Sequence, residues 1–164
     1  MAIVIDQNTR VIIQGITGNI GRVMATRMSR HYSNLVGGVT PGKGGMSVSE
    51  LPVYDTVAEA VGELGANASA ILVPAPFVKD AAAEALDAGI KTLWVYADGL
   101  GFHDTLTIIS WARHYGARLI GPNSAGLVSP GKASLSELSE DYIPLRPGCL
   151  GVVSKSGSLT YDVV

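Results

Sequence analysis

Three glycines at a three-residue spacing follow an apolar run in the stretch "RVIIQGITGNIGRVM" (residues 10–24). The run is typical of a buried strand, and the residues after the glycines have the pattern of a helix. Gly15 and Gly18 allow backbone angles and a closeness of approach that a Cβ would hinder. Free N–H groups at a helix start favour an anion, and a diphosphate is the natural ligand. The alternative is a tight strand-to-helix turn that binds nothing.

The spacing of these glycines argues against an NAD-binding turn, which has the pattern G-x-G-x-x-G rather than G-x-x-G-x-x-G. NAD proteins also place an acid after the second strand, whereas the stretch "GGVTPGKGG" places Lys43 there. A lysine suits an additional phosphate, which both NADP and coenzyme A carry on the adenosine ribose. The alternative for Lys43 is a solvated loop cation, although its flanking glycines would let the loop fold close over a ligand.

Further candidates follow later strands of the predicted sheet. "VPAP" places Val73 and Pro74 where they either form an apolar ledge for an adenine or a pantetheine arm, or simply end the strand. "YADG" places Tyr96, Ala97 and Asp98 after the next strand. The carboxylate of Asp98 either accepts a hydrogen bond from a ligand or caps the helix that begins nearby.

Two small polar stretches complete the set of candidate binding residues. "GPNSAG" places Asn123 and Ser124 at a strand end, either lining a narrow tunnel or forming an ordinary turn. "GVVSKSGSLTYD" places Ser154, Ser156 and Gly157 at a predicted strand-to-helix junction. Two hydroxyls and free helix N–H groups form either an anion site or a plain N-cap.

Strand and helix patterns alternate along the chain, which predicts a Rossmann-like α/β fold: a doubly wound, mainly parallel sheet with helices on both faces. Ligands of such sheets bind at the carboxyl ends of the strands. In the first helix, the pattern places Ile20, Val23, Met24 and Met28 on one face. The expected strands cover residues 11–16, 34–40, 51–55, 68–76, 91–99, 117–121 and 149–154, the helices 20–32, 56–65, 78–89, 104–116 and 156–164, and a long loop 122–148.

Composition excludes several classes of protein. The chain has 164 residues and a formal net charge of −2, so nucleic acid is not expected as a partner. Its apolar runs are shorter than the ~20 residues needed to span a bilayer, so no membrane insertion is expected. The single cysteine, Cys149, rules out an internal disulfide and suits a reducing compartment. We expect a soluble, cytoplasmic protein.

Four motifs in this order and spacing, "GGVTPGKGG", "VPAPF", "IGPNSAGLVSPGK" and "SKSGSLTYDVV", resemble the alpha subunit of succinyl-CoA synthetase (succinate–CoA ligase, NDP-forming). The resemblance covers essentially the whole chain and implies the N-terminal CoA-binding domain of that subunit. It implies a reaction that joins a carboxylate to CoA through a phosphohistidine and an acyl phosphate, and a helix end at 154–157 that faces the phosphohistidine. The CoA contacts that it implies are Thr17, Gly18, Asn19, Ile20, Lys43, Tyr96, Ala97 and Asp98.

Some residues depart from the family pattern. The family has Thr-Phe-His where this chain has Arg22, Val23 and Met24, and Cys-Pro where it has Ser124 and Ala125. These departures leave the acid substrate open, and the nucleotide, ATP or GTP, is open as well.

The resemblance also implies a division of the chain. The family's phosphohistidine lies in a second domain, so we expect residues 1–150 to form the CoA-binding domain and 151–164 to begin a truncated ligase domain. The chain alone is then inactive, a beta subunit is its expected partner, and the fragment can form a homo-oligomer. The alternatives are an NADP-binding oxidoreductase domain, although no catalytic Tyr-x-x-x-Lys is present, and a free-standing CoA-binding protein without catalysis.

Overall fold

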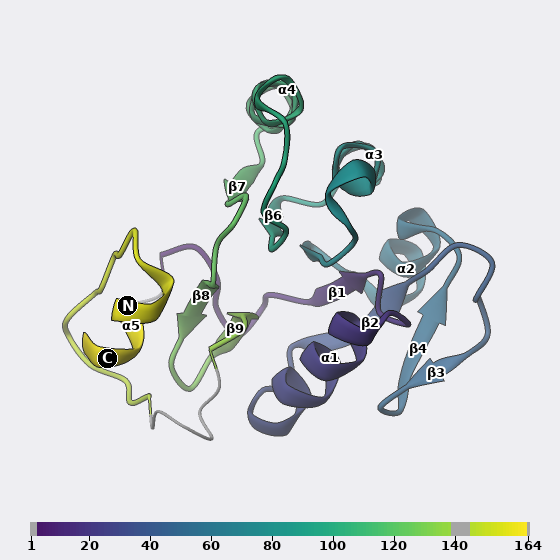
Figure 1. The fold of residues 1–164 in the computed structure, drawn as a ribbon. Coiled ribbons are helices and arrows are strands. Elements are labelled where there is room, and N and C mark those ends of the chain that lie inside the picture. The colour runs from purple at the N-terminus through teal and green to yellow at the C-terminus, as the bar shows by residue number, and fades with distance from the viewer. Residues whose placement is uncertain (1–2, 139–144, 164) are drawn as a thin grey trace.

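The computed structural model describes residues 3–138 and 145–163 and contains a seven-stranded sheet in the order β3-β4-β2-β1-β5-β6-β7 (Figure 1). All neighbouring strands are parallel except the pair β3 and β4. The chain moves outward from β1 on one side and then returns to its other side at β5, so the strand order reverses at β1. The strands are β1 Val11–Gln14, β2 Leu35–Val39, β3 Ser47–Val48, β4 Leu51–Tyr54, β5 Ala68–Ile71, β6 Thr92–Val95 and β7 Arg118–Ile120.

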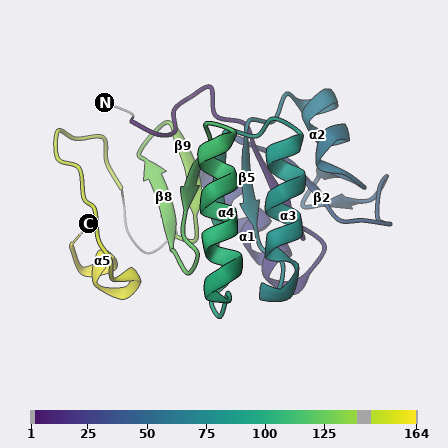
Figure 2. The ribbon, with the colours of Figure 1, turned by 90° about the horizontal axis from the view of Figure 1, so that it is seen from above.

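Both faces of the sheet are covered, as the sequence predicted. Helices α2, α3 and α4 lie on one face, whereas α1 and a separate antiparallel hairpin of β8 and β9 lie on the other (Figures 1 and 2). The prediction of a Rossmann-like fold is therefore confirmed. The helices are α1 Asn19–His31, α2 Val57–Leu64, α3 Ala75–Asp87, α4 Phe102–His114 and α5 Gly157–Val163, and the hairpin strands are β8 Gly126–Ser129 and β9 Ala133–Ser136.

Burial on both faces explains why the strands have continuous apolar sequences. Successive side chains of β1 alternate between the two layers: Ile12 packs with the layer of α2, α3 and α4, and Ile13 with the layer of α1 and the hairpin. Trp94 of β6 is fully buried on the hairpin side. A parallel sheet covered in this way holds its carboxyl edge rigid, and binding loops extend from that edge.

The buried face of α1 differs in part from the sequence prediction. Met24 and Met28 are buried as expected, but Ile20 and Val23 are each 48% exposed. The buried positions are Gly21, Met24, Ala25 and Met28, which follow the i, i+3, i+4, i+7 spacing of one helix face. A glycine occupies the innermost position, so the apolar pattern alone predicted the wrong face at this end.

The predicted long loop 122–148 was wrong, because it contains the hairpin of β8 and β9. The two strands are joined by residues 130–132 with Gly131 at φ +71°, a three-residue connection common in hairpins. The predicted strand 149–154 is also absent, since this segment pairs with no strand within residues 3–138 and 145–163, and Val153 is fully exposed. Residues 139–144 of the predicted loop lie outside the described part of the chain.

The hairpin is fastened to the sheet by Asn34, which precedes β2 and is 7% exposed. Its Nδ2 donates to the Ser134 carbonyl at 2.9 Å, and its Oδ1 accepts from the Ser134 N–H at 3.2 Å.

We expect Asn34→Ala to lower the free energy of unfolding by about 2 kcal/mol, because two buried backbone groups lose their partner. Urea denaturation measures this change. Ser134→Ala is the matched control, because it keeps both backbone hydrogen bonds with Asn34. An equal loss of stability in the two variants would contradict the role of Asn34 in fastening the hairpin to the sheet.

Candidate functional site

The glycine turn forms the centre of the carboxyl edge of the sheet. Gly15, at φ +86°, directs the chain out of β1, and the N–H of Gly18 donates to its carbonyl at 3.0 Å. Gly18 is the N-cap of α1 and supplies no side-chain cap. Within the described residues, the N–H groups of Asn19, Ile20 and Gly21 have no hydrogen-bond acceptor. These donors, at the positive end of the α1 dipole, suit a phosphate group.

Thr40, which directly follows β2, joins the glycine turn to the next loop. Its Oγ1 accepts a hydrogen bond from the Oγ1 of Thr17 at 3.2 Å, and a longer one from the Thr17 N–H at 3.4 Å. The carbonyl of Thr40 accepts from the N–H of Lys43 at 3.0 Å. Sequence reasoning missed Thr40, although a hydroxyl residue directly after the second strand is a recognisable signal.

We expect Thr40→Val to weaken binding of the predicted ligand, CoA, about fivefold, because the substitution keeps the shape but removes the acceptor that joins the two loops. Isothermal titration calorimetry measures the change in Kd. Thr107→Val is the matched control, since among the described residues the Thr107 hydroxyl bonds only the His103 carbonyl of its own helix. An unchanged Kd in Thr40→Val would contradict this coupling.

The loop that carries Lys43 is held by its backbone. The N–H of Gly44 donates to Oδ1 of Asp55 at 2.8 Å, and the N–H of Gly45 donates to the Val53 carbonyl at 3.0 Å. Gly42 and Gly45 adopt φ values of +73° and +83°, which favour glycine. Lys43 itself is exposed, and among the described residues its amino group has no partner. A fixed backbone with an uncommitted cation fits the predicted phosphate contact.

Val73 lies beside the glycine turn: a Cβ added to Gly15 would be 3.1 Å from Cγ1 of Val73. The strand before it is shorter than predicted: β5 ends at Ile71, and α3 begins at Ala75 with Pro74 as its N-cap. Val73 is half-buried and Pro74 is exposed, and their contact with a ligand stays a prediction.

Two loops at the ends of β6 and β7 meet beside the turn. The N–H of Asn123 donates to the carbonyl of Ala97 at 3.0 Å, and Nε1 of the buried Trp94 donates to the carbonyl of Ser124 at 2.8 Å. Asn123 has φ +52°, a left-handed conformation that asparagine tolerates well. The structure thus brings Ala97, Asn123 and Ser124 together, as a shared ligand contact requires.

Tyr96 and Asp98 flank this meeting point. Burial raises the pKa of Tyr96, and the negative charge of Glu137 raises it further. Burial also raises the pKa of Tyr161 in α5, again with Glu137 adding to the effect. Both phenols are therefore neutral hydrogen-bond donors near pH 7. Asp98 is exposed and does not cap α4, whose N-cap is Gly101 without a side-chain bond, so its carboxylate is available to a ligand.

At the start of α5, the hydroxyl oxygens of Ser154 and Ser156 accept hydrogen bonds from backbone N–H groups. Oγ of Ser156 accepts from the N–H of Leu159 at 3.2 Å, and Oγ of Ser154 accepts from the N–H of Ser156 at 3.1 Å. A Cβ added to Gly157 would lie 4.0 Å from that of Ala125, so this helix end adjoins the loop of residues 121–125. The contact with a phosphate stays a prediction.

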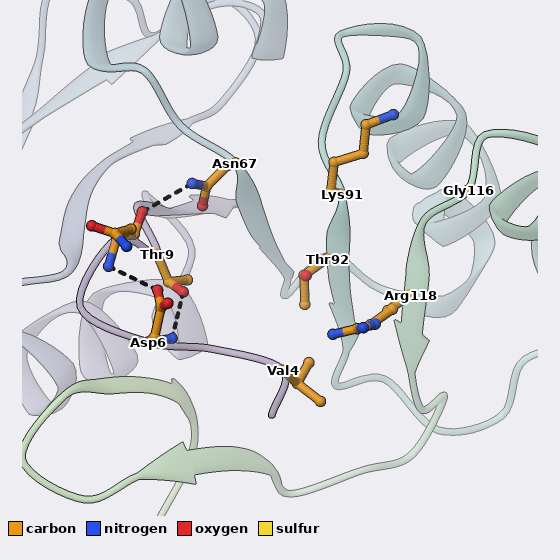
Figure 3. Close-up of a pocket in the computed structure, with 9 residues that line it drawn as sticks. Val4, Asp6, Thr9, Asn67, Lys91, Thr92, Gly116 and Arg118 are labelled. Atoms are coloured by element: carbon orange, nitrogen blue, oxygen red, sulfur yellow. Dashed lines mark hydrogen bonds between the residues drawn. The ribbon is translucent and has the colours of Figure 1, made fainter. Parts of the chain in front are cut away.

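A cavity of about 400 Å³ lies at the opposite edge of the sheet, where β5, β6 and β7 begin (Figure 3). None of the predicted site residues lines it. Its two cations are held by carbonyls: Nζ of Lys91 donates to Tyr115 at 3.1 Å, and Nη1 of Arg118 donates to Ile3 at 3.1 Å. The predicted site is instead an open set of loops at the carboxyl edge.

Two other kinds of site find no support in the described part of the chain. No group of three or more His, Cys, Asp or Glu side chains is placed to hold a metal ion. No helix there combines the length and the apolar character required to cross a bilayer. The carboxyl-edge loops, by contrast, fit a ligand with several phosphates, because they offer unpaired N–H groups at α1 and the free cation of Lys43.

Comparison with known protein sequences identifies relatives among CoA ligases. The chain is 48% identical to succinate–CoA ligase [ADP-forming] subunit alpha 2 of Archaeoglobus fulgidus, over 99% of this chain and 56% of the relative. It is 43% identical to the malate–CoA ligase alpha subunit of Methylorubrum extorquens, over 99% of this chain and 55% of the relative. The chain thus spans about half the length of the relatives it matches.

Comparison with solved structures supports the fold. ATP citrate lyase from Methanothrix soehngenii, solved with citrate and coenzyme A, matches at a TM-score of 0.79 and 22% identity, over 98% of this chain and 29% of that one. Acetyl-coenzyme A synthetase 1 of Ca. Korarchaeum cryptofilum, in complex with phosphate and ADP, matches at 0.69 and 17% identity, over 96% of this chain and 34% of that one.

A family model described as "CoA binding domain" matches residues 6–99, which include the glycine turn, the Lys43 loop and the Tyr96–Asp98 segment. The match confirms coenzyme A as the predicted cofactor and covers more than half of the chain. The chain therefore belongs to the family of CoA-binding domains.

Proposed function

We propose that this chain is the CoA-binding part of the alpha subunit of an NDP-forming acid–thiol ligase of the succinate–CoA ligase type. The observation that carries the proposal is the 48% identity to an alpha subunit of such a ligase over 99% of the chain. Other relatives are a malate–CoA ligase subunit at 43% identity and an ADP-forming sulfoacetate–CoA ligase subunit of Bilophila wadsworthia at 39%. Succinate, malate and sulfoacetate are all small acids with a second acidic group, which is the substrate class that we propose.

CoA supplies the thiol that becomes the thioester, and the residues of this chain hold and orient it. In the proposed arrangement, the diphosphate lies on the free N–H groups of Asn19, Ile20 and Gly21, where the α1 dipole is positive. Lys43 neutralises the 3′-phosphate of the ribose, because residues after the second strand of this fold lie beside the ribose. The arm then follows Val73 and the Tyr96–Asp98 segment toward Asn123 and Ser124, which β6 and β7 position.

The remaining parts of the ligase belong to the same proposal. Ser154, Ser156 and Gly157 would face a phosphohistidine carried by a second domain that begins near residue 151, and a beta subunit would complete the enzyme. Cys149 is free and exposed, which suits the reducing cytoplasm.

Because the phosphohistidine belongs to the proposed second domain, we expect no thioester when this chain alone is mixed with succinate, CoA and ATP or GTP. Thioester formation under these conditions would contradict the proposed division of the ligase.

A chimera tests the proposal most directly. Residues 1–164 replace the corresponding part of the alpha 2 subunit of the Archaeoglobus fulgidus relative, and thioester formation is followed with succinate and with malate. We expect the chimera to retain activity, because CoA would occupy the same carboxyl-edge loops. The chimera with Lys43→Ala should have a raised KM for CoA and a similar kcat. A folded chimera without activity, beside an active parent ligase, would contradict the proposal.

A further inference from the structure

Arg22 lies in the first turn of α1 and folds back onto the glycine turn. Its Nε donates to the carbonyl of Thr17 at 2.9 Å, so the guanidinium group is anchored beside the free N–H groups of the helix start. The side chain is exposed, and no carboxylate of the described residues pairs with it. Because Nε is occupied by Thr17, the two Nη atoms are the part of the guanidinium group that remains available to a ligand.

A cation at this place is electrostatically unfavourable in the free protein. The start of a helix carries a positive partial charge, which favours acidic residues, and the first turn of α1 contains none. An anion at the helix start would reverse this relation, since it would be attracted by the helix and by Arg22 together. A guanidinium group also presents a planar pair of donors that matches the oxygens of a phosphate group.

We propose that Arg22 is a second phosphate-binding cation of the CoA site and contacts the diphosphate. This inference rests on the proposed function, because it takes CoA to be bound at the start of α1. Arg22 and Lys43 then have different partners. Arg22 is anchored to the turn itself, where this fold places a diphosphate, whereas Lys43 extends from the loop after β2, where the ribose lies.

The test compares CoA with dephospho-CoA, which keeps the diphosphate but lacks the 3′-phosphate. We expect Arg22→Gln to raise the Kd of both ligands by about tenfold, the size of one lost hydrogen bond to a charged group. Arg22→Lys keeps the charge but not the planar fork, and should recover part of the affinity. Binding should also depend less steeply on salt concentration in Arg22→Gln than in the wild type.

Arg113→Gln is the matched control, because it removes the same charge from an exposed position in the last turn of α4, at the opposite end of that helix from the carboxyl edge. Its Kd values should equal those of the wild type. The inference is overturned if folded Arg22→Gln binds both ligands as the wild type does, if it loses affinity for CoA alone, or if Arg113→Gln loses as much. Failure of the wild type to bind CoA would instead contradict the proposed function.

Discussion

Replacing Gly21 by alanine is expected to lower the free energy of unfolding by about 3 kcal/mol and to abolish CoA binding. The new Cβ would lie 2.2 Å from the carbonyl oxygen of Gly15, and 2.7 and 2.8 Å from Cα and O of Ile16. All three are backbone atoms, so no side chain can rotate away and α1 must move off the turn. The helix start would then no longer present its N–H groups in the same place. Urea denaturation and calorimetry with CoA measure the two effects.

Gly62→Ala is the control for this substitution. Gly62 lies inside α2, and a Cβ there would meet nothing within 4 Å. Alanine should therefore stabilise the protein by up to about 1 kcal/mol, since it restricts the unfolded chain and favours the helix. A Gly21→Ala protein with the stability and CoA affinity of the wild type would contradict the close packing of α1 on the turn.

Lys43→Ala is expected to weaken CoA binding by about tenfold or more and to leave the binding of dephospho-CoA nearly unchanged. The reason is that the Lys43 amino group is the uncommitted cation of a loop held in place by Thr40 and Asp55. If the Lys43 amino group contacts the ribose 3′-phosphate, its removal lowers the affinity for CoA, which carries this phosphate, and spares dephospho-CoA, which lacks it. Parallel titrations of the variant with both ligands measure this difference.

Lys132→Ala provides the control, because Lys132 is an exposed lysine in the turn between β8 and β9. It should bind both ligands as the wild type does. An equal loss of CoA and dephospho-CoA affinity in Lys43→Ala would place this amino group on the diphosphate instead of the ribose phosphate.

The sheet was predictable because each of its buried strands is a short apolar run between helical patterns. Burial on two faces removes the need for polar residues, and the resulting contrast is visible in the sequence. The hairpin of β8 and β9 was not predicted, because its strands are short, contain serine, and are joined to the sheet through a residue distant in sequence, Asn34. The segment 149–154 has the composition of a strand but pairs with no strand in the part of the chain that the structure describes, which composition cannot reveal.

The positions of the candidate site residues were predictable where a residue type and a strand end coincide, as at Gly18 and Lys43. The links between loops were not, because they depend on side-chain directions. Thr40 joins two loops through one hydroxyl, and Arg22 turns back along its helix to Thr17. The hydroxyls of Ser154 and Ser156 accept hydrogen bonds from the N–H groups of Ser156 and Leu159, partners that the sequence alone could not name.

The central claim, that the carboxyl-edge loops bind CoA, is tested most directly by titrating this chain with CoA, NADP and NAD in parallel by calorimetry. All three contain an adenosine diphosphate, but only CoA carries both a ribose 3′-phosphate and, on its 5′-diphosphate, a pantetheine arm, which we propose extends toward Asn123 and Ser124. The expected result is micromolar binding of CoA, with no binding of NADP or NAD at the same concentrations. Micromolar binding of NADP with none of CoA would contradict the account.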